Sequence, residues 1–469
     1  MKKMTEAGRV LAVTESLCPH CLAKIPARRV ARGNHVYLEK ECPEHGSFKV
    51  VIWRGEPSFE SWSRPKIPAV INVPLTRVER GCPFDCGLCP DHRQHTCTAV
   101  LEVTGRCNLH CSFCFAGSGG GAARDPDPGV IRGWYRTLLD AGGPYNIQLS
   151  GGEPTMRDDL PGLVSMGRDM GFSFIQLNTN GLRLSREPRF FEELQRAGLA
   201  SLFLQFDGTE SEIYRKLRGR DLLADKLETI RLCGELGIGV ILVPTVVPGV
   251  NDHNIGDIID LALEHLPVVR GVHFQPVSYF GRYPQPPSDD MRITLPEVIS
   301  NIARQTGGRI KVENFRPPGC ENALCSFHGN FILMPGGTLM PTTRHETNQN
   351  TSCCCTPELA VEGSRKSRKF VANHWSASRP VPVQKSCSCG GGGMEEFIRT
   401  DSMDLFLARA KTHTLCISGM AFQDVWNVDL ERVKDCCIHT VSPAGKLIPF
   451  CAYNITDSQG RSIYRGRAD

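Results

Sequence analysis

The sequence predicts an α/β protein built around a parallel sheet, with metal-binding segments on both sides of it. Three observations predict this fold class. Short apolar runs alternate with longer amphipathic runs between residues 99 and 280. Ten of the 22 cysteines lie before residue 115 and eleven lie after residue 319, so they frame that region. Three cysteines also stand close together directly after the first apolar run.

The alternating region contains six strand candidates and five helix candidates. The strands are expected at 99–104, 146–150, 173–178, 201–206, 240–246 and 271–277, and the helices near 128–141, 159–171, 188–198, 221–236 and 253–265. A strand period that alternates with a helix period indicates βα units and a parallel sheet. Six strands are fewer than the eight of a complete barrel.

The distribution of cysteines divides the chain into four regions. We expect a metal-binding knuckle at 1–65, a second cysteine segment at 66–98, the strand–helix region at 99–300 and a cysteine-rich module at 301–469. Cys233 alone stands in the middle of the chain, on a helix-like stretch, and is read as a small buried apolar residue.

Composition excludes some classes of function. The net charge of +4 is spread without a basic block, which argues against a nucleic-acid partner. No run of about 18 apolar residues predicts a transmembrane segment. The N-terminus leads to no apolar export signal, so we interpret the many cysteines as metal ligands in a reducing cytoplasm. The apolar stretch 403–410 is either an interfacial helix with peripheral membrane contact or part of the core.

Cys107, Cys111 and Cys114 form the most informative motif, with the spacing C-x3-C-x2-C. Three thiolates can hold one iron–sulfur cluster, but a cluster of four irons then keeps one iron open. An open position distinguishes a reactive metal site from a structural one. The alternative is a structural zinc or iron knot.

A second motif, Gly151, Gly152, Glu153 and Pro154, ends the next strand candidate. Two glycines allow a ligand to approach the backbone closely. The carboxylate of Glu153 can hold an ammonium group.

The pair of motifs resembles the radical S-adenosylmethionine (SAM) superfamily. The resemblance implies a six-stranded partial (βα)6 barrel and a [4Fe-4S] cluster on Cys107, Cys111 and Cys114, with SAM on the fourth iron. It also implies that Gly151, Gly152 and Glu153 line the SAM amino group and that Phe113 lies near the adenine. One electron passed to the sulfonium would release methionine and a 5′-deoxyadenosyl radical, which takes hydrogen from the substrate.

Polar residues also follow the later strand candidates. They are Asn178 after the third, Gln205 and Asp207 after the fourth, Thr245 in the fifth, and His273 and Gln275 in the sixth. Ligands of such sheets bind at the carboxyl ends of the strands. By resemblance, Asn178, Gln205, Asp207 and Thr245 touch the ribose, carboxylate or methionyl part of SAM. Each could instead cap a helix or a turn.

An upstream run repeats the same spacing and adds a fourth cysteine. It consists of Cys82, Cys86, Cys89 and Cys97. Four thiolates suit a closed cluster, so we assign this group to an auxiliary [4Fe-4S] cluster, with His92 or His95 as alternative fourth ligands. Leu88 holds the position that Phe113 holds in the downstream motif.

Two further cysteine groups stand near the ends of the chain. Cys18, Cys21, Cys42 and His45 predict a zinc ribbon or a rubredoxin-like iron site. A joint auxiliary cluster is expected from Cys320, Cys325, Cys436, Cys437 and Cys451, with Cys416 as an alternative. The roles of the cysteines at 353–355 and of Cys387 and Cys389 stay open.

The order of these motifs, ending in Ile448-Pro-Phe-Cys451-Ala-Tyr-Asn454, resembles one radical SAM subgroup. That subgroup includes an archaeal tetraether lipid synthase, earlier described as a dihydropterin methyltransferase. The resemblance implies hydrogen abstraction from unactivated carbon, with coupling of lipid chains as the favoured reaction. The alternatives are a methyltransferase for a pterin or another small molecule, a peptide-modifying enzyme, and a non-catalytic electron-transfer protein. A ferredoxin or flavodoxin is the expected electron donor.

Overall fold

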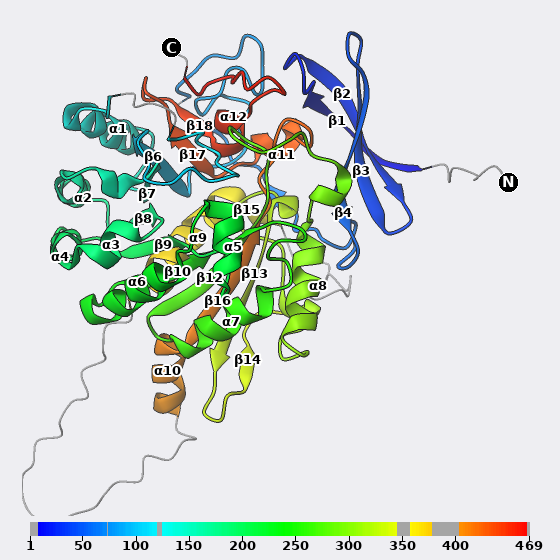
Figure 1. Cartoon of the computed structure of the whole chain (residues 1–469). Helices are drawn as coiled ribbons and strands as arrows, with labels where there is room; N and C mark the ends of the chain where they lie inside the picture. The colour runs from blue at the N-terminus through cyan, green and yellow to red at the C-terminus, as the bar shows by residue number, and fades with distance from the viewer. Residues whose placement is uncertain (1–7, 73, 120–123, 345–356, 378–402, 467–469) are drawn as a thin grey trace, which may run out of the picture.

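The computed structural model describes residues 8–72, 74–119, 124–344, 357–377 and 403–466. A small antiparallel sheet lies at one side of the molecule, next to a large curved sheet that carries most of the helices (Figure 1). The predicted cysteines at 353–355, 387 and 389 lie outside the described residues.

The small sheet is the N-terminal ribbon. Its strands pair in chain order, and they are β1 (Arg9–Leu17), β2 (Lys24–Arg32), β3 (His35–Cys42) and β4 (Gly46–Arg54). The turns β1–β2 and β3–β4 carry the four predicted metal ligands of this region. Alternating burial, as in β3, buries one face of the sheet and leaves the other exposed.

The six predicted strands lie side by side in the large sheet. They are β6 (Thr98–Thr104), β7 (Asn146–Gly151), β8 (Ile175–Thr179), β9 (Ser201–Gln205), β10 (Gly239–Val243) and β12 (Val269–Pro276), all parallel and in chain order. Every residue of β10 is buried, as expected for a parallel strand covered on both faces. The short strand β11 (Thr245–Val246) also pairs with β12.

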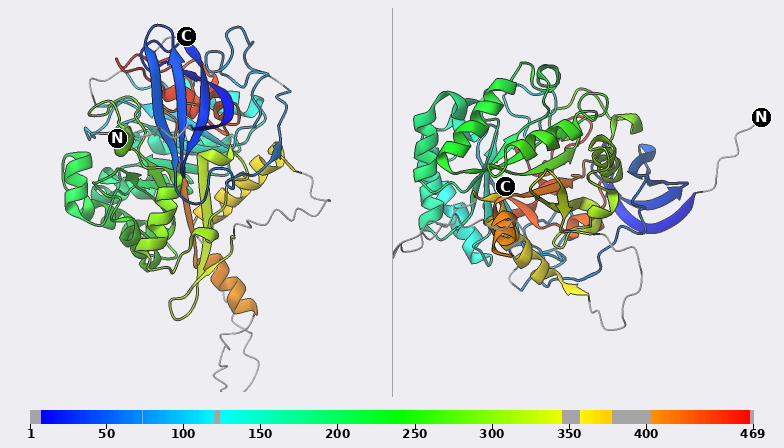
Figure 2. Two further views of the ribbon diagram at one scale, coloured as in Figure 1. Left: turned by 90° about the vertical axis from the view of Figure 1, so that its right-hand side faces the viewer. Right: turned by 90° about the horizontal axis from the view of Figure 1, so that it is seen from below.

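Helices follow these strands and cover the outer face of the sheet (Figure 2). The five predicted helices are α1 (Pro128–Asp140), α2 (Leu160–Asp169), α4 (Pro188–Arg196), α6 (Leu223–Leu236) and α7 (Ile255–Glu264). Two short helices were not predicted, α3 (Leu182–Arg186) and α5 (Ser211–Arg218). Cys233 on α6 is fully buried, as its apolar interpretation requires.

The C-terminal region extends the same sheet at both edges. Two of its strands pair in parallel with the barrel, β16 (Thr414–Met420) with β12 and β17 (Ile438–Val441) with β6. The antiparallel strands β13 (Ser326–Leu333), β14 (Leu339–Pro341) and β18 (Leu447–Pro449) follow outside them. Apart from β15 (Glu358–Leu359), the described strands of 301–469 therefore belong to the barrel's own sheet, and the parallel part is wider than the sequence predicts.

The remaining elements pack around the two larger sheets. They are β5 (Lys66–Ile67), which pairs with β15, and α8 (Leu295–Gln305), α9 (Ala360–Trp375), α10 (Met403–Thr412), α11 (Leu430–Lys434) and α12 (Phe450–Asn454). Helix α9 also contributes to the cavity inside the curved sheet. Helix α10 projects from the lower end of the molecule (Figure 1), and its Met403 and Leu407 are 69% and 48% exposed. Its exposed apolar side chains do not support the core interpretation of 403–410.

Among the described helices, none is long and apolar enough to cross a bilayer.

A buried ion pair joins the barrel to the C-terminal region. Asp424 accepts two hydrogen bonds from the Arg292 guanidinium, at 2.9 and 3.0 Å, and a third from the backbone N–H of Tyr279 at 3.0 Å. The Asp424 side chain is 0% exposed and that of Arg292 is 4% exposed. Because both charges are removed from water, each needs the opposite charge to offset the loss of its hydration.

The ribbon is held against the last part of the chain. Buried Lys40 donates to the carbonyl oxygens of Leu17 and Val425, and Thr14 donates to Asp429 at 2.7 Å. Further along the chain, Arg461 donates to the carbonyl of His20 at 2.8 Å. Burial lowers the pKa of Lys40 to about 7. The first and last segments of the described chain therefore form one interface.

Candidate functional site

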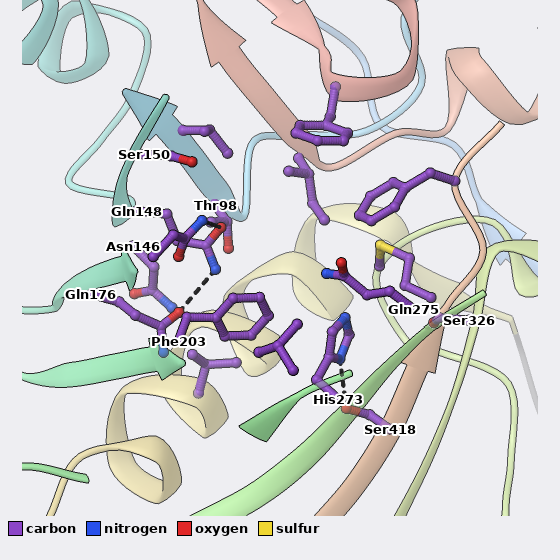
Figure 3. A pocket seen from close by; sticks show the side chains of 18 of the residues that line it. Thr98, Asn146, Gln148, Ser150, Gln176, Phe203, His273, Gln275, Ser326 and Ser418 are labelled. Carbon is purple, nitrogen blue, oxygen red and sulfur yellow. Dashed lines mark hydrogen bonds between the residues drawn. The ribbon is translucent and has the colours of Figure 1, made fainter. Parts of the chain in front are cut away.

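A cavity of about 550 Å³ lies inside the curved sheet. Its wall includes the cluster loop, the glycine motif and the ends of the parallel strands, as predicted for a site at the carboxyl edge of such a sheet. Figure 3 shows the part of this cavity that is lined by Gln148, Gln176, His273 and Gln275.

The loop after β6 carries Cys107, Cys111 and Cys114 into the cavity wall. Arg282 fixes this loop, because its side chain donates to the carbonyls of Cys111 and Ser118, both at 2.9 Å. The three sulfur atoms do not all lie within 4.8 Å of one another, which leaves room for a cluster of several irons rather than one ion. Burial raises the pKa of Cys107 to about 11, so a nearby cation would be needed to keep its thiolate.

The glycine motif packs directly on the cluster loop. Gly151 has a φ of +118°, and the backbone N–H of Gly152 donates to the carbonyl of Thr104 at 2.8 Å. A Cβ on Gly152 would stand 2.1 Å from the carbonyl oxygen of Arg106. Glycine is therefore required here by the approach of two backbone segments, in addition to any ligand contact.

We expect Gly152→Ala to reduce formation of 5′-deoxyadenosine by about tenfold or more, because the cluster loop must shift to admit the methyl group. The measurement is the initial rate with SAM and a chemical reductant. Gly162→Ala is the matched control, since nothing lies within 4 Å of its Cβ position. Equal rates in the two variants would contradict the packing argument.

The carboxylate of Glu153 accepts hydrogen bonds from other groups of the protein. One oxygen accepts from Thr155 N, Thr155 Oγ1 and Thr179 Oγ1 at 3.1, 2.7 and 2.7 Å, and the other accepts from Asn180 N at 2.7 Å. A carboxylate offers about four acceptor positions. The structure therefore gives Glu153 a positioning role between β7 and β8, and the contact between its carboxylate and the ammonium group of SAM stays a prediction.

Asp207 is likewise paired within the protein. It accepts from Arg218 Nε and Nη2, both at 2.7 Å, and from the backbone N–H of Thr245 at 3.2 Å. Arg218 Nη2 also lies 3.3 Å from Thr245 Oγ1. Asp207 and Thr245 thus hold the Arg218 guanidinium at the cavity wall.

Sequence reasoning missed two buried cations, Arg218 on α5 and Lys226 on α6. Lys226 donates to the carbonyl of Asn180 and, at 3.3 Å, to Gln205 Oε1. Burial lowers its pKa to about 8. The signal was present in the sequence, because Lys226 occupies an apolar-face position with Ile230 and Cys233 at i+4 and i+7.

Asn178 is the predicted SAM contact that retains a free atom. Its Oδ1 is buried and has no hydrogen-bond partner within the described structure. A buried acceptor without a donor is unfavourable by about 1–3 kcal/mol, so a bound ligand that donates a hydrogen bond would stabilise it. Together with the three cysteines, Arg218 and Phe113 on the same cavity wall, this atom fits the binding of a cluster and SAM.

The cysteines of the upstream run separate into two places. Cys82, Cys86 and Cys89 remain together, since Cys82 and Cys89 both interact electrostatically with Cys86, and Cys82 interacts with Cys89. The Cys97 sulfur lies instead within 4.8 Å of the sulfurs of Cys320 and Cys437. Cys97 is therefore not the fourth member of the upstream group, because it directly precedes β6, and the paired strand β17 starts directly after Cys437.

The alternative histidine ligands are also engaged elsewhere. His92 Nε2 lies 2.8 Å from the carbonyl oxygen of Cys436, and burial lowers its pKa to about 4. His95 is half-buried, and burial lowers its pKa as well. Neither residue belongs to a group of three or more ligand atoms among the described residues.

The five C-terminal cysteines do not form one group either. Cys320 and Cys437 lie with Cys97, whereas Cys325, Cys436 and Cys451 lie around Arg432, which donates to Cys325 Sγ at 3.4 Å. The neighbours Cys436 and Cys437 thus belong to different groups, because successive side chains of an extended segment point to opposite sides. Cys416 on β16 is buried near Arg270, apart from both.

The ribbon brings its four predicted ligands together. All ligand atoms of Cys18, Cys21, Cys42 and His45 lie within 4.8 Å of one another. Nδ1 of His45 is 3.5 Å from Cys42 Sγ and 3.7 Å from Cys18 Sγ. Three sulfurs and one imidazole at this spacing suit one tetrahedral ion such as zinc.

Amide side chains line the part of the cavity shown in Figure 3. Gln148 donates to Gln176 at 2.9 Å, and Asn178 approaches Gln148 at 3.5 Å. On the facing side, His273 Nδ1 lies 2.8 Å from Ser418 Oγ, and burial lowers the pKa of His273 to about 4. The imidazole is therefore neutral near pH 7.

A parallel partial barrel with an open three-cysteine loop defines a class of enzyme that generates radicals from SAM. The family model described as "Radical SAM superfamily" matches residues 101–262, and the one described as "HMPTM N-terminal zinc ribbon domain" matches residues 10–54.

Known proteins extend this match to nearly the whole chain. The 7,8-dihydro-6-hydroxymethylpterin dimethyltransferase of Methanocaldococcus jannaschii is 35% identical over 95% of this chain and 94% of its own length. A probable GTP 3′,8-cyclase of Methanothermobacter thermautotrophicus is 29% identical over 37% of this chain and 56% of its own. The chain therefore belongs to the radical SAM superfamily, in the family of that dimethyltransferase.

Among solved structures, Streptococcus suis SuiB bound to S-adenosylmethionine matches with a TM-score of 0.36 and 16% identity, over 46% of this chain and 47% of that chain.

Proposed function

We propose that this radical SAM enzyme acts on a small, polar, planar substrate held inside the barrel and transfers a methyl group to it. The amide lining of the cavity carries this proposal. Gln148, Gln176 and Gln275 face the same space as His273 (Figure 3). Hydrocarbon in contact with these groups would leave their free donors and acceptors without partners, at about 1–3 kcal/mol each.

The names of similar proteins support the same substrate class. The relative that matches over nearly the full chain is named for a dihydropterin, and the shorter match is named for GTP, and both molecules contain a fused nitrogen heterocycle. The aromatic rings of Phe203 and Trp375 stack with an angle of 24° at 5.9 Å in the same cavity. Aromatic faces suit stacking on a planar ring, while the amide side chains can form hydrogen bonds with the polar atoms at its edge.

The chain's own residues have separable tasks in this proposal. Cys107, Cys111 and Cys114 would hold the cluster, and Asn178, Gln205 and Arg218 would bind polar parts of SAM next to Gly151 and Gly152. When bound, the reduced cluster and SAM supply the 5′-deoxyadenosyl radical that removes one hydrogen atom from the substrate.

Coupling of lipid chains is the second candidate. A cluster of three phenylalanines in the cavity wall supports it. The rings of Phe422 and Phe115 both pack on the ring of Phe450, with 4.6 and 5.5 Å between the ring centres. This apolar wall would suit a hydrocarbon chain. Peptide modification is not proposed, since no feature of the described cavity favours an extended chain.

The deciding experiment compares two substrates under anaerobic conditions. Protein with reconstituted clusters is incubated with reductant and SAM labelled with ¹³C in its methyl group, together with either 7,8-dihydro-6-hydroxymethylpterin or a total lipid extract. We expect the pterin to raise 5′-deoxyadenosine formation at least ~10-fold over the lipid and to gain the labelled methyl. Lipid products that lack two hydrogens per joined pair, without labelled pterin, would reject the proposal.

A matched pair of variants tests the amide lining directly. Gln275→Leu should lower kcat/KM for the polar substrate by about 10- to 100-fold, because one buried hydrogen bond is lost. The exposed Gln285→Leu, which makes the same chemical change outside the cavity, should have no effect. Unchanged kcat/KM in Gln275→Leu would contradict amide recognition.

A further inference from the structure

Three cysteines from separate segments meet beside the substrate cavity. Cys97 precedes β6, Cys437 precedes β17, and Cys320 stands before the short turn at Ala323–Cys325. The backbone N–H of Cys97 donates to the carbonyl of Cys437 at 2.7 Å, and the Gln94 side chain donates to the carbonyl of Cys320 at 2.6 Å. All three thiols are buried, at 6%, 3% and 3% exposure. Paired strands and side-chain hydrogen bonds therefore fix all three positions.

The spacing of the sulfur atoms indicates what this group can hold. All three lie within 4.8 Å of one another. Thiolates on one tetrahedral ion stand about 3.8 Å apart, since each metal–sulfur bond is about 2.3 Å. In a four-iron cluster each thiolate binds its own iron, which spreads the sulfurs to about 6 Å. The observed spacing is that of a single ion.

Two other groups in the same chain serve as internal comparisons. The ribbon ligands Cys18, Cys21, Cys42 and His45 meet the same 4.8 Å limit, and the ribbon matches a zinc-binding family. The sulfurs of the cluster loop at 107–114 do not meet it. The group of Cys97, Cys320 and Cys437 thus resembles the zinc site rather than the cluster site.

A carboxylate lies beside the group, next to Cys437, while the group whose ligand atoms are all within 4.8 Å of one another consists of the three cysteines. Glu321 Oε2 lies 3.7 Å from Cys437 Sγ, while its other oxygen accepts a hydrogen bond from Ser326. Glu321 lines the same cavity wall as the three cysteines. A carboxylate beside three buried thiols is unfavourable without a cation, because every ionised member is negative.

We propose that Cys97, Cys320 and Cys437 bind one zinc ion, with Glu321 as the fourth ligand. The three sulfurs and one oxygen are ligands that zinc accepts. The ion joins the starts of β6 and β17 to the segment before β13, so it ties the C-terminal strands to the barrel beside the substrate cavity. This site is independent of the substrate proposed above. It leaves Cys82, Cys86 and Cys89, and Cys325, Cys436 and Cys451, for the auxiliary clusters.

Metal and sulfide analysis tests the proposal. Protein purified anaerobically is assayed for zinc, iron and acid-labile sulfide, for the native chain and for Cys97→Ser. We expect Cys97→Ser to lose one zinc per chain and to keep its iron and sulfide. The neighbour variant Cys436→Ser should instead lose iron together with sulfide and keep its zinc. Loss of iron and sulfide from Cys97→Ser, or retention of all its zinc, would overturn the proposal.

Two further variants keep the result decisive. Cys42→Ser removes a ribbon ligand, so it should lose one zinc, and the double variant with Cys97→Ser should lose two. If Cys97→Ser does not fold, as judged by circular dichroism, Cys320→Ser from a different segment takes its place with the same expected loss. Zinc content in the double variant equal to that of Cys42→Ser alone would also refute the site.

Discussion

Alanine at Cys107, Cys111 and Cys114 together is expected to abolish formation of 5′-deoxyadenosine. The three thiols stand on one loop that Arg282 and the glycine motif hold against the cavity. Without them, no group at this position can hold a cluster with an open iron, so no electron reaches SAM. The measurement is 5′-deoxyadenosine by mass spectrometry after anaerobic reconstitution with reductant and SAM.

The control for this experiment is Cys233→Ala, which removes a buried cysteine from α6 without touching a metal group. It should retain its activity. The triple variant should also retain the iron of the auxiliary groups, so its iron content should fall by only about four per chain. Undiminished 5′-deoxyadenosine in the triple variant would refute the assignment of the cluster loop.

Asp424→Asn is expected to lower the free energy of unfolding by about 3–5 kcal/mol. Asp424 is fully buried and neutralises Arg292 through two hydrogen bonds, and it also accepts from the backbone of Tyr279 and Trp426. The amide keeps the size of the side chain but leaves the guanidinium buried without a counter-charge. Urea denaturation under anaerobic conditions, followed by circular dichroism, measures the change.

Asp260→Asn provides the matched control for that prediction. It makes the same chemical change in the Arg309 ion pair, where both side chains are 45% exposed. Water screens this pair, so the expected change is below about 1 kcal/mol. Similar losses in the two variants would show that burial does not decide the strength of the Arg292–Asp424 pair.

The sequence predicted the elements whose signals are local. Each of the six parallel strands forms one apolar run, and the cluster loop is a single short motif, so both could be read from neighbouring residues. The four ribbon ligands are two short knuckles separated by a hairpin and were grouped correctly for the same reason.

The grouping of the other cysteines could not be read in this way. Cys97 follows Cys82, Cys86 and Cys89 closely in sequence, yet strand pairing between β6 and β17 brings it to Cys437. Pairing between distant segments leaves no mark in local spacing. The buried cations Arg218 and Lys226 were missed for another reason, because long charged side chains are usually solvated and their place on an apolar helix face was not weighed.

The interface between the ribbon and residues 425–461 has a consequence for biosynthesis. The ribbon leaves the ribosome first, but Val425, Asp429 and Arg461, which hold it, are translated near the end. At 5–20 residues per second, a finished ribbon waits roughly 20 to 75 seconds for them. Docking of the ribbon is then a late event of folding, and it falls in the same stretch of translation as Cys436, Cys437 and Cys451, the last cysteines of the C-terminal groups.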